Sequence, residues 1–332
     1  MTNPLLPPLA HPAVMPTTPV VSTHTQWALL SVAGADAVGF LHGQLSSDVN
    51  ALRPGEGQYW SYNSPKGRML ANGVLWRAPL RDDAIAMLLA ADLAETIRRR
   101  LAMFVLRAKV RVDDITEGHA LLGLAGTEAA QAAHEALGVQ VPAASSAAAF
   151  GGEATIFALP DGRYAIVGPA PQGAIDQAAL ARHASIVDAD VWRWLGIAAG
   201  VPWIGAATSD QFVPQMANWD VLGGVSFRKG CYPGQEIVAR MQYLGRLKER
   251  LFAFRTDAFD VAPGARLYSS AFGADQPCGS VVNAAPHPAG GVALLAVVQL
   301  VAVEADDLAL GAADGPRLRR HALPYDVPPP AA

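Results

Sequence analysis

The sequence predicts an α+β fold whose C-terminal part is all β. From residue 27 to 183, short strand-like runs alternate with amphipathic helical runs, a pattern typical of antiparallel sheets with helices on one face. From 251 to 304, short β-like runs are separated by Gly and Pro clusters without a helical period, which favours a small barrel or sandwich. A chain of 332 residues exceeds one ordinary core, so two or three domains are expected.

The first α+β unit contains several strand-like runs. They are 27–32, 59–62, 70–77, 84–90 and 109–112. The stretch from Asn63 to Gly67 has turn chemistry, so the strands on either side of it are expected to pair.

Two helices are expected between these strands. Asp36 can cap the first helix, which would run to about Val49. Asp92 and Glu95 have the spacing of a capping box, so the second helix would begin there. Its arginines at 98–100 are interpreted as a solvated helix face rather than as an RNA contact.

A second unit of the same kind begins near Gly118. Its expected strands are 120–124, 155–159 and 164–167, and its expected helices are 128–137 and 175–183. The stretch 143–152 is rich in Ala, Ser and Gly and is expected to be a loop. The β-like runs of the C-terminal part are 251–255, 265–269, 279–282 and 292–303.

These patterns divide the chain into five parts. The N-terminal part is rich in proline and contains neither a basic stretch nor an apolar core, so it is interpreted as a disordered leader rather than a signal peptide. The expected parts are a leader at 1–21, a first α+β domain at 22–117, a second at 118–190, a segment at 191–250 that packs back on the first domain, and a C-terminal barrel with a mobile tail at 251–332.

Composition excludes several classes of protein. A net charge of −4 with 16% charged residues provides no broad basic field for nucleic acid. Two cysteines cannot build a disulfide framework or a four-cysteine metal site, which indicates a reducing compartment. The longest apolar run, 291–303, is too short to span a bilayer, so a cytoplasmic protein without a membrane partner is expected.

Motifs of common enzyme classes are absent from the sequence. The histidines show no helical metal-ligand spacing, so no metal site is predicted. There is no nucleophile elbow, P-loop or Gly-x-Gly-x-x-Gly fingerprint, which disfavours ordinary hydrolases, kinases and dehydrogenases.

The most informative stretch is 229–236, Lys-Gly-Cys-Tyr-Pro-Gly-Gln-Glu. Cys231 precedes a helix expected to begin near Gly234 or Gln235, and Lys229 stands two residues before it. Both features lower the pKa of a thiol, and the thiolate is the reactive form. The alternative is a small buried apolar residue, as free cysteines often are. The polar, Gly-rich surroundings favour an exposed turn, so Cys231 and Lys229 are the candidate catalytic residues.

The same stretch resembles the signature of the YgfZ family, folate-binding proteins related to the glycine-cleavage aminomethyltransferases. Further matching stretches occur in order at 34–36, 43–49, 66–68, 200–202, 212–218, 223–227 and 323–325. The resemblance implies two ferredoxin-like α/β domains plus a small C-terminal β-barrel, arranged as a ring around a central folate cavity. Tetrahydrofolate, or a one-carbon derivative of it, is the implied cofactor.

Two tryptophans match positions associated with the folate pocket of the family. They are Trp27, which opens the first strand, and Trp192, which lies eight residues before Gly200. A flat pterin ring requires an aromatic wall, which tryptophan supplies. The alternative is that both are ordinary core residues.

The resemblance also implies polar folate contacts. Glu236 or Gln235 would face the pterin edge, and Arg240 would face the glutamate tail. Asn218 would contribute amide hydrogen bonds, and Lys66 lies in a turn that faces the cavity in relatives. The alternative for Glu236 and Arg240 is an ordinary i, i+4 pair on a helix surface.

The sequence departs from the aminomethyltransferases where those enzymes carry an acid/base aspartate. The matching stretch, 66–72, ends in Asn72 and contains no carboxylate. The step at 198–200 is Ala-Ala-Gly, where relatives often have Glu-Ala-Gly. Proton transfer needs a positioned titratable group, so an ordinary aminomethyltransferase is disfavoured.

The resemblance therefore implies an accessory factor. YgfZ-like proteins use tetrahydrofolate to support synthesis or repair of iron–sulfur enzymes, including those that thiomethylate tRNA. Cys231 would act as a thiolate near folate, and client enzymes or cluster carriers would supply the other cluster ligands. One alternative is a folate-dependent one-carbon transferase that recruits Asp82 or Asp83. Another is a tRNA-binding module that uses the arginines at 98–100 and 246–250.

Overall fold

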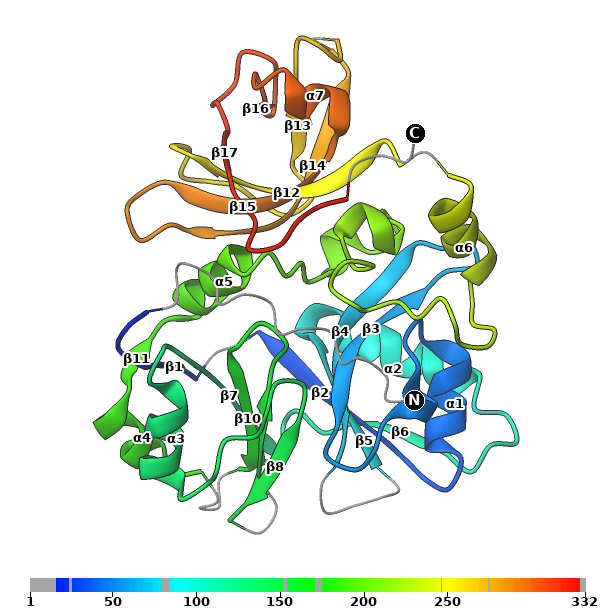
Figure 1. The fold of residues 1–332 in the computed structure, drawn as a ribbon, viewed down its shortest axis with the longest axis vertical. Helices are drawn as coiled ribbons and strands as arrows, with labels where there is room; N and C mark the ends of the chain where they lie inside the picture. The colour runs from blue at the N-terminus through cyan, green and yellow to red at the C-terminus, as the bar shows by residue number, and fades with distance from the viewer. Residues whose placement is uncertain are drawn as a thin grey trace.

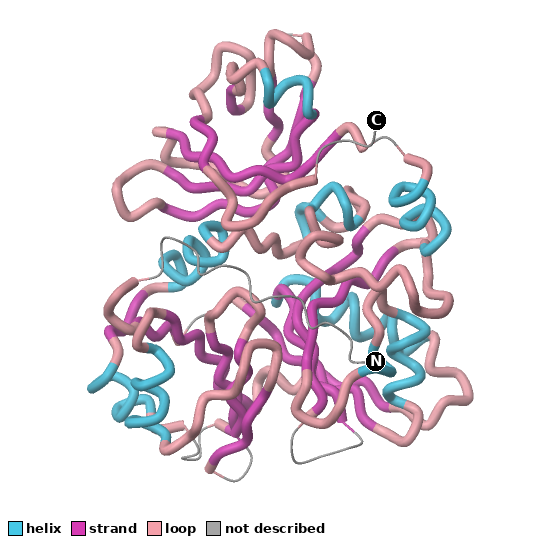
Figure 2. Tube along the Cα trace, viewed as in Figure 1, coloured by secondary structure: helices cyan, strands magenta, loops and turns pink. Residues whose placement is uncertain are grey.

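The structure is a computed structural model that describes residues 16–23, 26–78, 84–151, 154–170, 175–245, 247–273 and 275–328. It is a mixed α/β fold with three sheets, as the sequence predicts. Figures 1 and 2 show two lobes with helices in the lower half of the view and a mostly β lobe above them. Within the described residues, every strand pair is antiparallel except β1 with β11.

The first sheet has the strand order β3-β4-β5-β2-β6. Its strands are β2 (Trp27–Ala33), β3 (Gly57–Asn63), β4 (Met69–Arg77), β5 (Ala84–Ala90) and β6 (Arg111–Asp114). The predicted hairpin is confirmed, because β3 pairs with β4 and Gly67 N donates to Ser64 O in the turn between them. Helices α1 (Ala37–Gln44) and α2 (Ala94–Met103) belong to the same lobe.

Helix α1 ends earlier than predicted, at Gln44 instead of about Val49. Leu45 adopts an extended backbone and bridges to Tyr62 of β3, which removes it from the helix. The 3₁₀ helix η1 (Val49–Ala51) then follows as a separate turn.

Neither predicted acidic cap is formed. The Asp36 carboxylate accepts a hydrogen bond from Lys109 N at 2.7 Å instead of capping α1. The Asp92 carboxylate accepts from Ala206 N at 2.9 Å, and α2 begins after the 3₁₀ helix η2 (Ala91–Leu93). Glu95 pairs with Arg98 and Arg99 on the exposed side of α2, as expected for a solvated face. The carboxylates of Asp36 and Asp92 therefore accept hydrogen bonds from distant backbone N–H groups and not from the first turn of the helices that follow them.

The second sheet has the order β11-β1-β7-β10-β9-β8. Its strands are β1 (Val20–Ser22), β7 (His119–Ala125), β8 (Ala147–Phe150), β9 (Ala154–Ala158), β10 (Tyr164–Pro169) and β11 (Ser185–Val187), with helices α3 (Ala129–Leu137) and α4 (Gln177–His183). Strand β8 lies inside the stretch expected to be a loop. Strand β1 includes residues 20–21 of the expected disordered leader, because it pairs with both β7 and β11.

The third sheet has the order β16-β13-β14-β15-β12-β17 and curves as a half-barrel. Its strands are β12 (Glu249–Thr256), β13 (Arg266–Tyr268), β14 (Pro277–Pro286), β15 (Val292–Gln299), β16 (Ala309–Leu310) and β17 (Arg319–His321). The run expected as one strand to 303 divides into β15 and the short helix α7 (Leu300–Glu304).

The segment between the second and third sheets connects all three lobes. It holds α5 (Ala189–Ala198), the 3₁₀ helices η3 (Ala206–Thr208) and η4 (Pro214–Ala217), and α6 (Gln235–Tyr243). Helix α5 packs against β14, β15 and β1, and it lies between the second and third sheets in Figure 1. The main hydrophobic core continues through the three sheets, with Leu30, Phe157 and Leu295 as members. Among the described residues, no helix is long and apolar enough to cross a membrane.

Candidate functional site

A cavity of about 640 Å³ lies where the first sheet, helix α5 and the third sheet meet. Its lining includes Trp27 at the start of β2, Trp192 of α5 and Asn283 of β14. Arg163, which precedes β10, brings the second sheet into the same lining. Small-molecule sites have volumes of roughly 300–1,000 Å³ and mostly apolar walls with a few polar groups. The cavity therefore has the size of a cofactor site.

Three tryptophans form an aromatic wall in this cavity. The rings of Trp27 and Trp203 are stacked, with centroids 5.0 Å apart and planes at 30°. The Trp192 ring meets Trp27 edge-on at 5.4 Å and 81°. Trp27 and Trp192 are only 8% and 2% exposed. The structure thus brings together the two tryptophans that the sequence singled out, with the Trp192 ring packed between the Arg163 guanidinium and Gly123.

Trp203 is a member of this wall that the sequence did not reveal. Asn283 of β14 accepts from its backbone N at 2.9 Å and donates to its backbone O at 2.8 Å. Asn72 of β4 holds the two neighbours in the same way, donating to Pro202 O and accepting from Ile204 N, both at 2.8 Å. The only sequence signal was the Gly-Val-Pro motif that directly precedes Trp203.

A buried ion pair supports the wall from the second sheet. The Arg163 guanidinium donates to the Asp161 carboxylate at 2.6 Å, and the two side chains are 2% and 1% exposed. The Arg163 guanidinium also lies 4.6 Å from the centre of the Trp192 ring, a cation–π contact. Gly196 of α5 lies next to the guanidinium, since a Cβ there would be in van der Waals contact with its nitrogens at 3.4 Å. In the sequence, Asp-Gly-Arg is typical of a surface turn, so the buried ion pair of Asp161 and Arg163 was not predicted.

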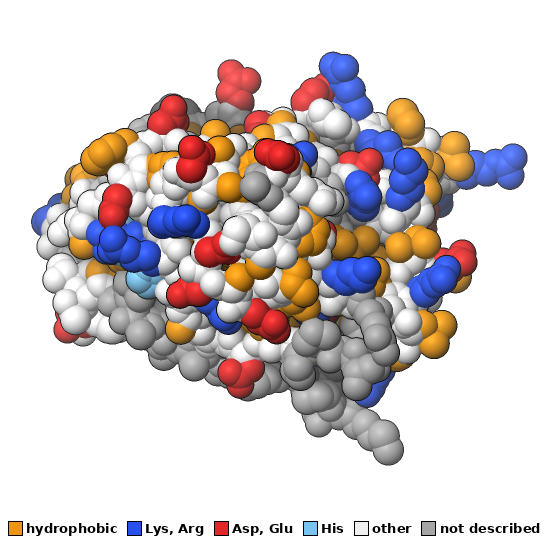
Figure 3. Space-filling model, turned by 90° about the horizontal axis from the view of Figure 1, so that it is seen from above, with side chains coloured by type: hydrophobic (Ala, Val, Ile, Leu, Met, Phe, Trp, Pro, Cys, Tyr) orange, Lys and Arg blue, Asp and Glu red, His pale blue; other side chains and the backbone are white. Residues whose placement is uncertain are grey.

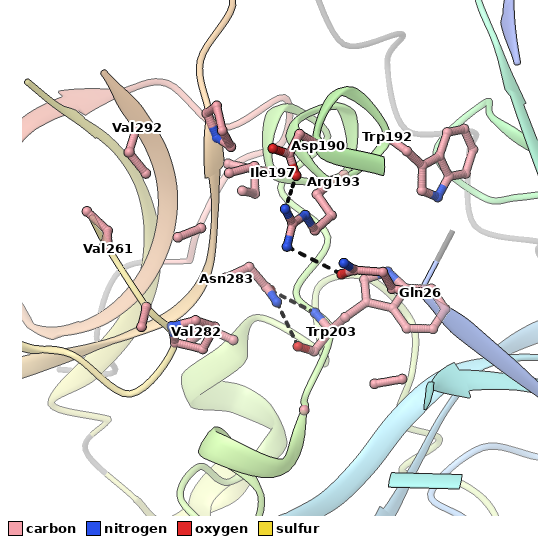
Figure 4. Close-up of a pocket in the computed structure, with 18 of the residues that line it drawn as sticks. Gln26, Asp190, Trp192, Arg193, Ile197, Trp203, Val261, Val282, Asn283 and Val292 are labelled. Atoms are coloured by element: carbon pink, nitrogen blue, oxygen red, sulfur yellow. Dashed lines mark hydrogen bonds and ion pairs between the residues drawn. The ribbon is translucent and has the colours of Figure 1, made fainter. Parts of the chain in front are cut away.

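The mouth of the cavity carries polar side chains. Arg193 of α5 donates to the Asp190 carboxylate and to Gln26 Oε1, the latter at 3.4 Å. Figure 4 shows this chain of contacts reaching from α5 across to Gln26. Gln26 has a φ of 58°, in the left-handed region that non-Gly residues seldom adopt.

Lys229 is held at the end of helix α1. Its Nζ donates to Leu45 O at 2.7 Å and to His42 O, and it lies 4.9 Å from the centre of the Tyr232 ring. A cation at a helix C-terminus is stabilised by the helix dipole. Burial lowers the pKa of Lys229 from 10.5 to about 8. The same contacts anchor the loop that presents Cys231, whose side chain is exposed.

The remaining predicted residues lie away from the cavity lining. Gln235, Glu236 and Arg240 are on α6, and the latter two are exposed. Lys66 is also exposed, and its turn packs on the start of α6, where Gly67 Cα lies 2.6 Å from the position of a Cβ on Gly234. Helix α6 lies at the edge of the molecule in Figure 1. These residues and Cys231 therefore belong to an outer surface, which we call the α6 surface.

Asn218 has a structural position. It is fully buried, its φ is 57°, and its Nδ2 donates to Leu251 O at 2.9 Å. This hydrogen bond ties the end of η4 to the third sheet. Asp82, Asp83 and Arg246 lie outside the described residues.

The described residues form neither a surface of one charge sign on the face in view nor a cluster of metal ligands. Acidic and basic side chains are interspersed on the face seen in Figure 3, with basic ones more frequent toward the end where α6 lies. Within the part of the chain that the structure describes, no group of three His, Cys, Asp or Glu side chains could hold a metal ion.

Comparison with known proteins gives consistent relatives, although no family model matches the chain. A tRNA-modifying protein YgfZ from Yersinia pestis (strain Pestoides F) is 34% identical over 228 residues, 68% of each chain. One from Enterobacter sp. (strain 638) is 32% identical over 303 residues, 91% of each chain. The crystal structure of glycine cleavage system aminomethyltransferase T from Bartonella henselae superimposes with a TM-score of 0.73 at 18% identity, covering 93% of this chain and 87% of that one. The latter similarity shows the fold alone.

Proposed function

The chain belongs to the YgfZ family, and from that membership we propose that it binds tetrahydrofolate in the tryptophan-lined cavity and supports synthesis or repair of iron–sulfur enzymes. The clients would include enzymes that thiomethylate tRNA, in keeping with relatives named tRNA-modifying proteins. Two ferredoxin-like domains and a barrel in a ring around the folate are part of this proposal. Bound tetrahydrofolate would supply a carrier of one-carbon units.

The observation that carries the proposal is the meeting of Trp27, Trp192 and Trp203 in one cavity. A pterin is flat and aromatic, and stacking on indole rings is favourable without requiring any one ring-edge pattern. The Arg163–Asp161 pair fixes the position of Trp192. Asn283 holds the Trp203 backbone, and the Trp203 ring already stacks on Trp27 without a ligand. A preformed wall lowers the entropic cost of binding.

The polar groups near the cavity support binding better than proton transfer. Both polar atoms of Asn72 are occupied by the backbone of Pro202 and Ile204. At the edge of the cavity, Oδ2 of the exposed Asp92 carboxylate accepts a hydrogen bond from Ala206 N, and Asp190 is paired with Arg193. A general acid or base must be free to exchange a proton with the reacting atom. Asn72 therefore serves as a structural clamp and not as an acid or base, which favours an accessory role over aminomethyl transfer.

Cys231 would act at the outer surface rather than beside the folate. Its thiol is exposed in a loop fixed by Lys229, and it is absent from the lining of the cavity. One thiolate provides a single cluster ligand, so a client or carrier protein would supply the others. In this proposal the cavity holds the cofactor and the α6 surface meets the iron–sulfur protein.

The proposal is tested in a bacterial strain that lacks its own YgfZ protein. The strain would receive the wild-type chain, Trp203→Ala, Cys231→Ser or Trp194→Ala, and thiomethylated nucleosides in its tRNA would be quantified by mass spectrometry. Trp194 is the matched control, because it lies on α5 beside His287 and outside the cavity lining. We expect the wild type and Trp194→Ala to restore the modification and the other two variants to fail. Full restoration by both Trp203→Ala and Cys231→Ser would refute the proposal.

A further inference from the structure

The cavity has two unlike ends. Its inner wall is aromatic and buried, with Trp27 and Trp192 almost inaccessible to solvent. Its mouth is polar and open, since the Arg193 and Asp190 side chains are 38% and 45% exposed. A ligand that matches both ends is flat and aromatic at one end and charged at the other.

Arg193 is suited to receive that charge. The described cavity lining carries two cations, Arg163 and Arg193, and three carboxylates, Asp92, Asp190 and Asp260. Arg163 is fully buried and donates from Nε and Nη2 to Asp161, so it cannot turn toward a ligand at the mouth. Arg193 is partly exposed, and its hydrogen bond to Gln26 is long, at 3.4 Å.

Not every N–H donor of Arg193 has an acceptor among the described residues. A guanidinium has five N–H donors in a planar fork that matches the geometry of a carboxylate. Asp190 and Gln26 accept from two of its nitrogens, and Nε is buried with no partner among the described residues. An incoming carboxylate could replace the weak Gln26 contact and gain a charge-assisted hydrogen bond.

We propose that Arg193 binds a carboxylate of the glutamate tail of folate, so that the pterin end lies against the tryptophans. The inference rests on the proposed function. It transfers the role of tail recognition from Arg240, which is exposed on α6 outside the cavity lining, to a residue of α5. Asp190 opposes the ligand charge, because it places a second carboxylate beside the one to be bound.

The test compares two ligands that differ only in the tail. Tetrahydropteroate carries the pterin and aminobenzoate of tetrahydrofolate without the glutamate. Affinities for both would be measured under reducing conditions with the wild-type chain, Arg193→Met and the control Arg240→Met. Arg193→Met should weaken tetrahydrofolate binding about 10- to 100-fold, the effect expected from losing a hydrogen bond to a charged group. Tetrahydropteroate binding should stay unchanged, and Arg240→Met should bind both ligands like the wild type.

Asp190→Asn provides an opposite and independent expectation. Removing the competing carboxylate should tighten tetrahydrofolate binding several-fold and leave tetrahydropteroate binding unchanged. Arg193→Lys keeps the charge but loses the fork, so it should show a smaller loss than Arg193→Met. These two variants decide the matter if thermal melting shows that Arg193→Met does not fold.

Several outcomes would overturn the inference. If Arg193→Met lost affinity for both ligands equally, Arg193 would shape the cavity and would not bind the glutamate tail. Unchanged tetrahydrofolate affinity in Arg193→Met, or in both Arg193→Lys and Asp190→Asn, would exclude the contact. If the wild type binds neither ligand, the proposed function fails and the inference fails with it. If the wild type binds both ligands with the same affinity, folate binding stands and tail recognition is excluded.

Discussion

The Asn283 side chain makes two hydrogen bonds to the backbone of Trp203, one as acceptor at 2.9 Å and one as donor at 2.8 Å. The two residues are 80 positions apart in the chain. A strand of the third sheet thereby holds the backbone of the residue whose ring stacks on Trp27 of the first sheet. The aromatic wall therefore depends on contacts between lobes.

Removing this clamp should weaken both folding and ligand binding. Asn283→Ala removes the partners of two part-buried backbone groups of Trp203, so we expect a loss of about 1 kcal/mol, the typical net contribution of a hydrogen bond. Urea unfolding would measure the loss. Ser280→Ala is the matched control, because Ser280 lies on the same strand and its buried hydroxyl has no partner among the described residues. Equal stability of the Asn283→Ala and Ser280→Ala proteins would contradict the clamp.

Asn72→Asp should not create an acid/base catalyst. The carboxylate would keep the bond from Ile204 N but would face Pro202 O without a proton to donate. Because Asn72 is fully buried, we expect a loss of stability of about 1–3 kcal/mol and no aminomethyl transfer from folate. Calorimetric melting and a transfer assay with an amine acceptor would measure the two effects. Wild-type stability with new transfer activity would show that Asn72 only replaces a catalytic aspartate.

Lys229 should make stability depend on alkaline pH. Burial lowers the pKa of Lys229 from 10.5 to about 8, so the unfolded chain holds more protons than the folded one between these values. The contribution of Lys229 to the free energy of unfolding should therefore rise as pH increases from 8 to 10.5, because the state that binds more protons, the unfolded one, is disfavoured as protons become scarce. Urea unfolding of the wild type and Lys229→Met at pH 7.5 and pH 9.5 would test this. The advantage of the wild type should grow at the higher pH, and a constant or shrinking difference would be the opposite result.

The two cysteines should differ sharply in reactivity. Cys231 is exposed, whereas Cys278 is buried and donates to Leu267 O at 3.4 Å. Burial raises the pKa of Cys278 to about 11, which suppresses its thiolate. Iodoacetamide should label only Cys231 in the native protein and both cysteines in urea, as read by peptide mass spectrometry. Cys231→Ser should then take up no label when native, and labelling of Cys278 at a similar rate would contradict the burial.

Local patterns predicted the elements whose signals lie within a few residues. Strand β2 and the β3–β4 hairpin were anticipated because short apolar runs and the turn chemistry between them lie within a few residues. Helix α6 was expected to begin at Gly234 or Gln235, and it begins at Gln235.

The missed features depend on distant partners. Helix α5 was not predicted, and in the structure it packs on β14 and β15, which lie about 80 residues or more further along the chain. The carboxylates of Asp36 and Asp92 resembled helix caps, but backbone groups of Lys109 and Ala206 use them instead. The same holds for the candidate site: Trp27 and Trp192 followed from the family resemblance, whereas Trp203 and Arg193 emerged only from the packing of the lobes.

Titration calorimetry with tetrahydrofolate tests the central claim most directly. The wild-type chain would be compared with Trp27→Ala, Trp192→Ala and the control Trp194→Ala. Stacking on an aromatic ring contributes about 1–3 kcal/mol, so each cavity variant should lose most of its affinity while the control retains it. Micromolar binding by the wild type that is lost in both cavity variants is the predicted result. No binding by the wild type, or equal binding by all four proteins, would contradict a folate site at these tryptophans.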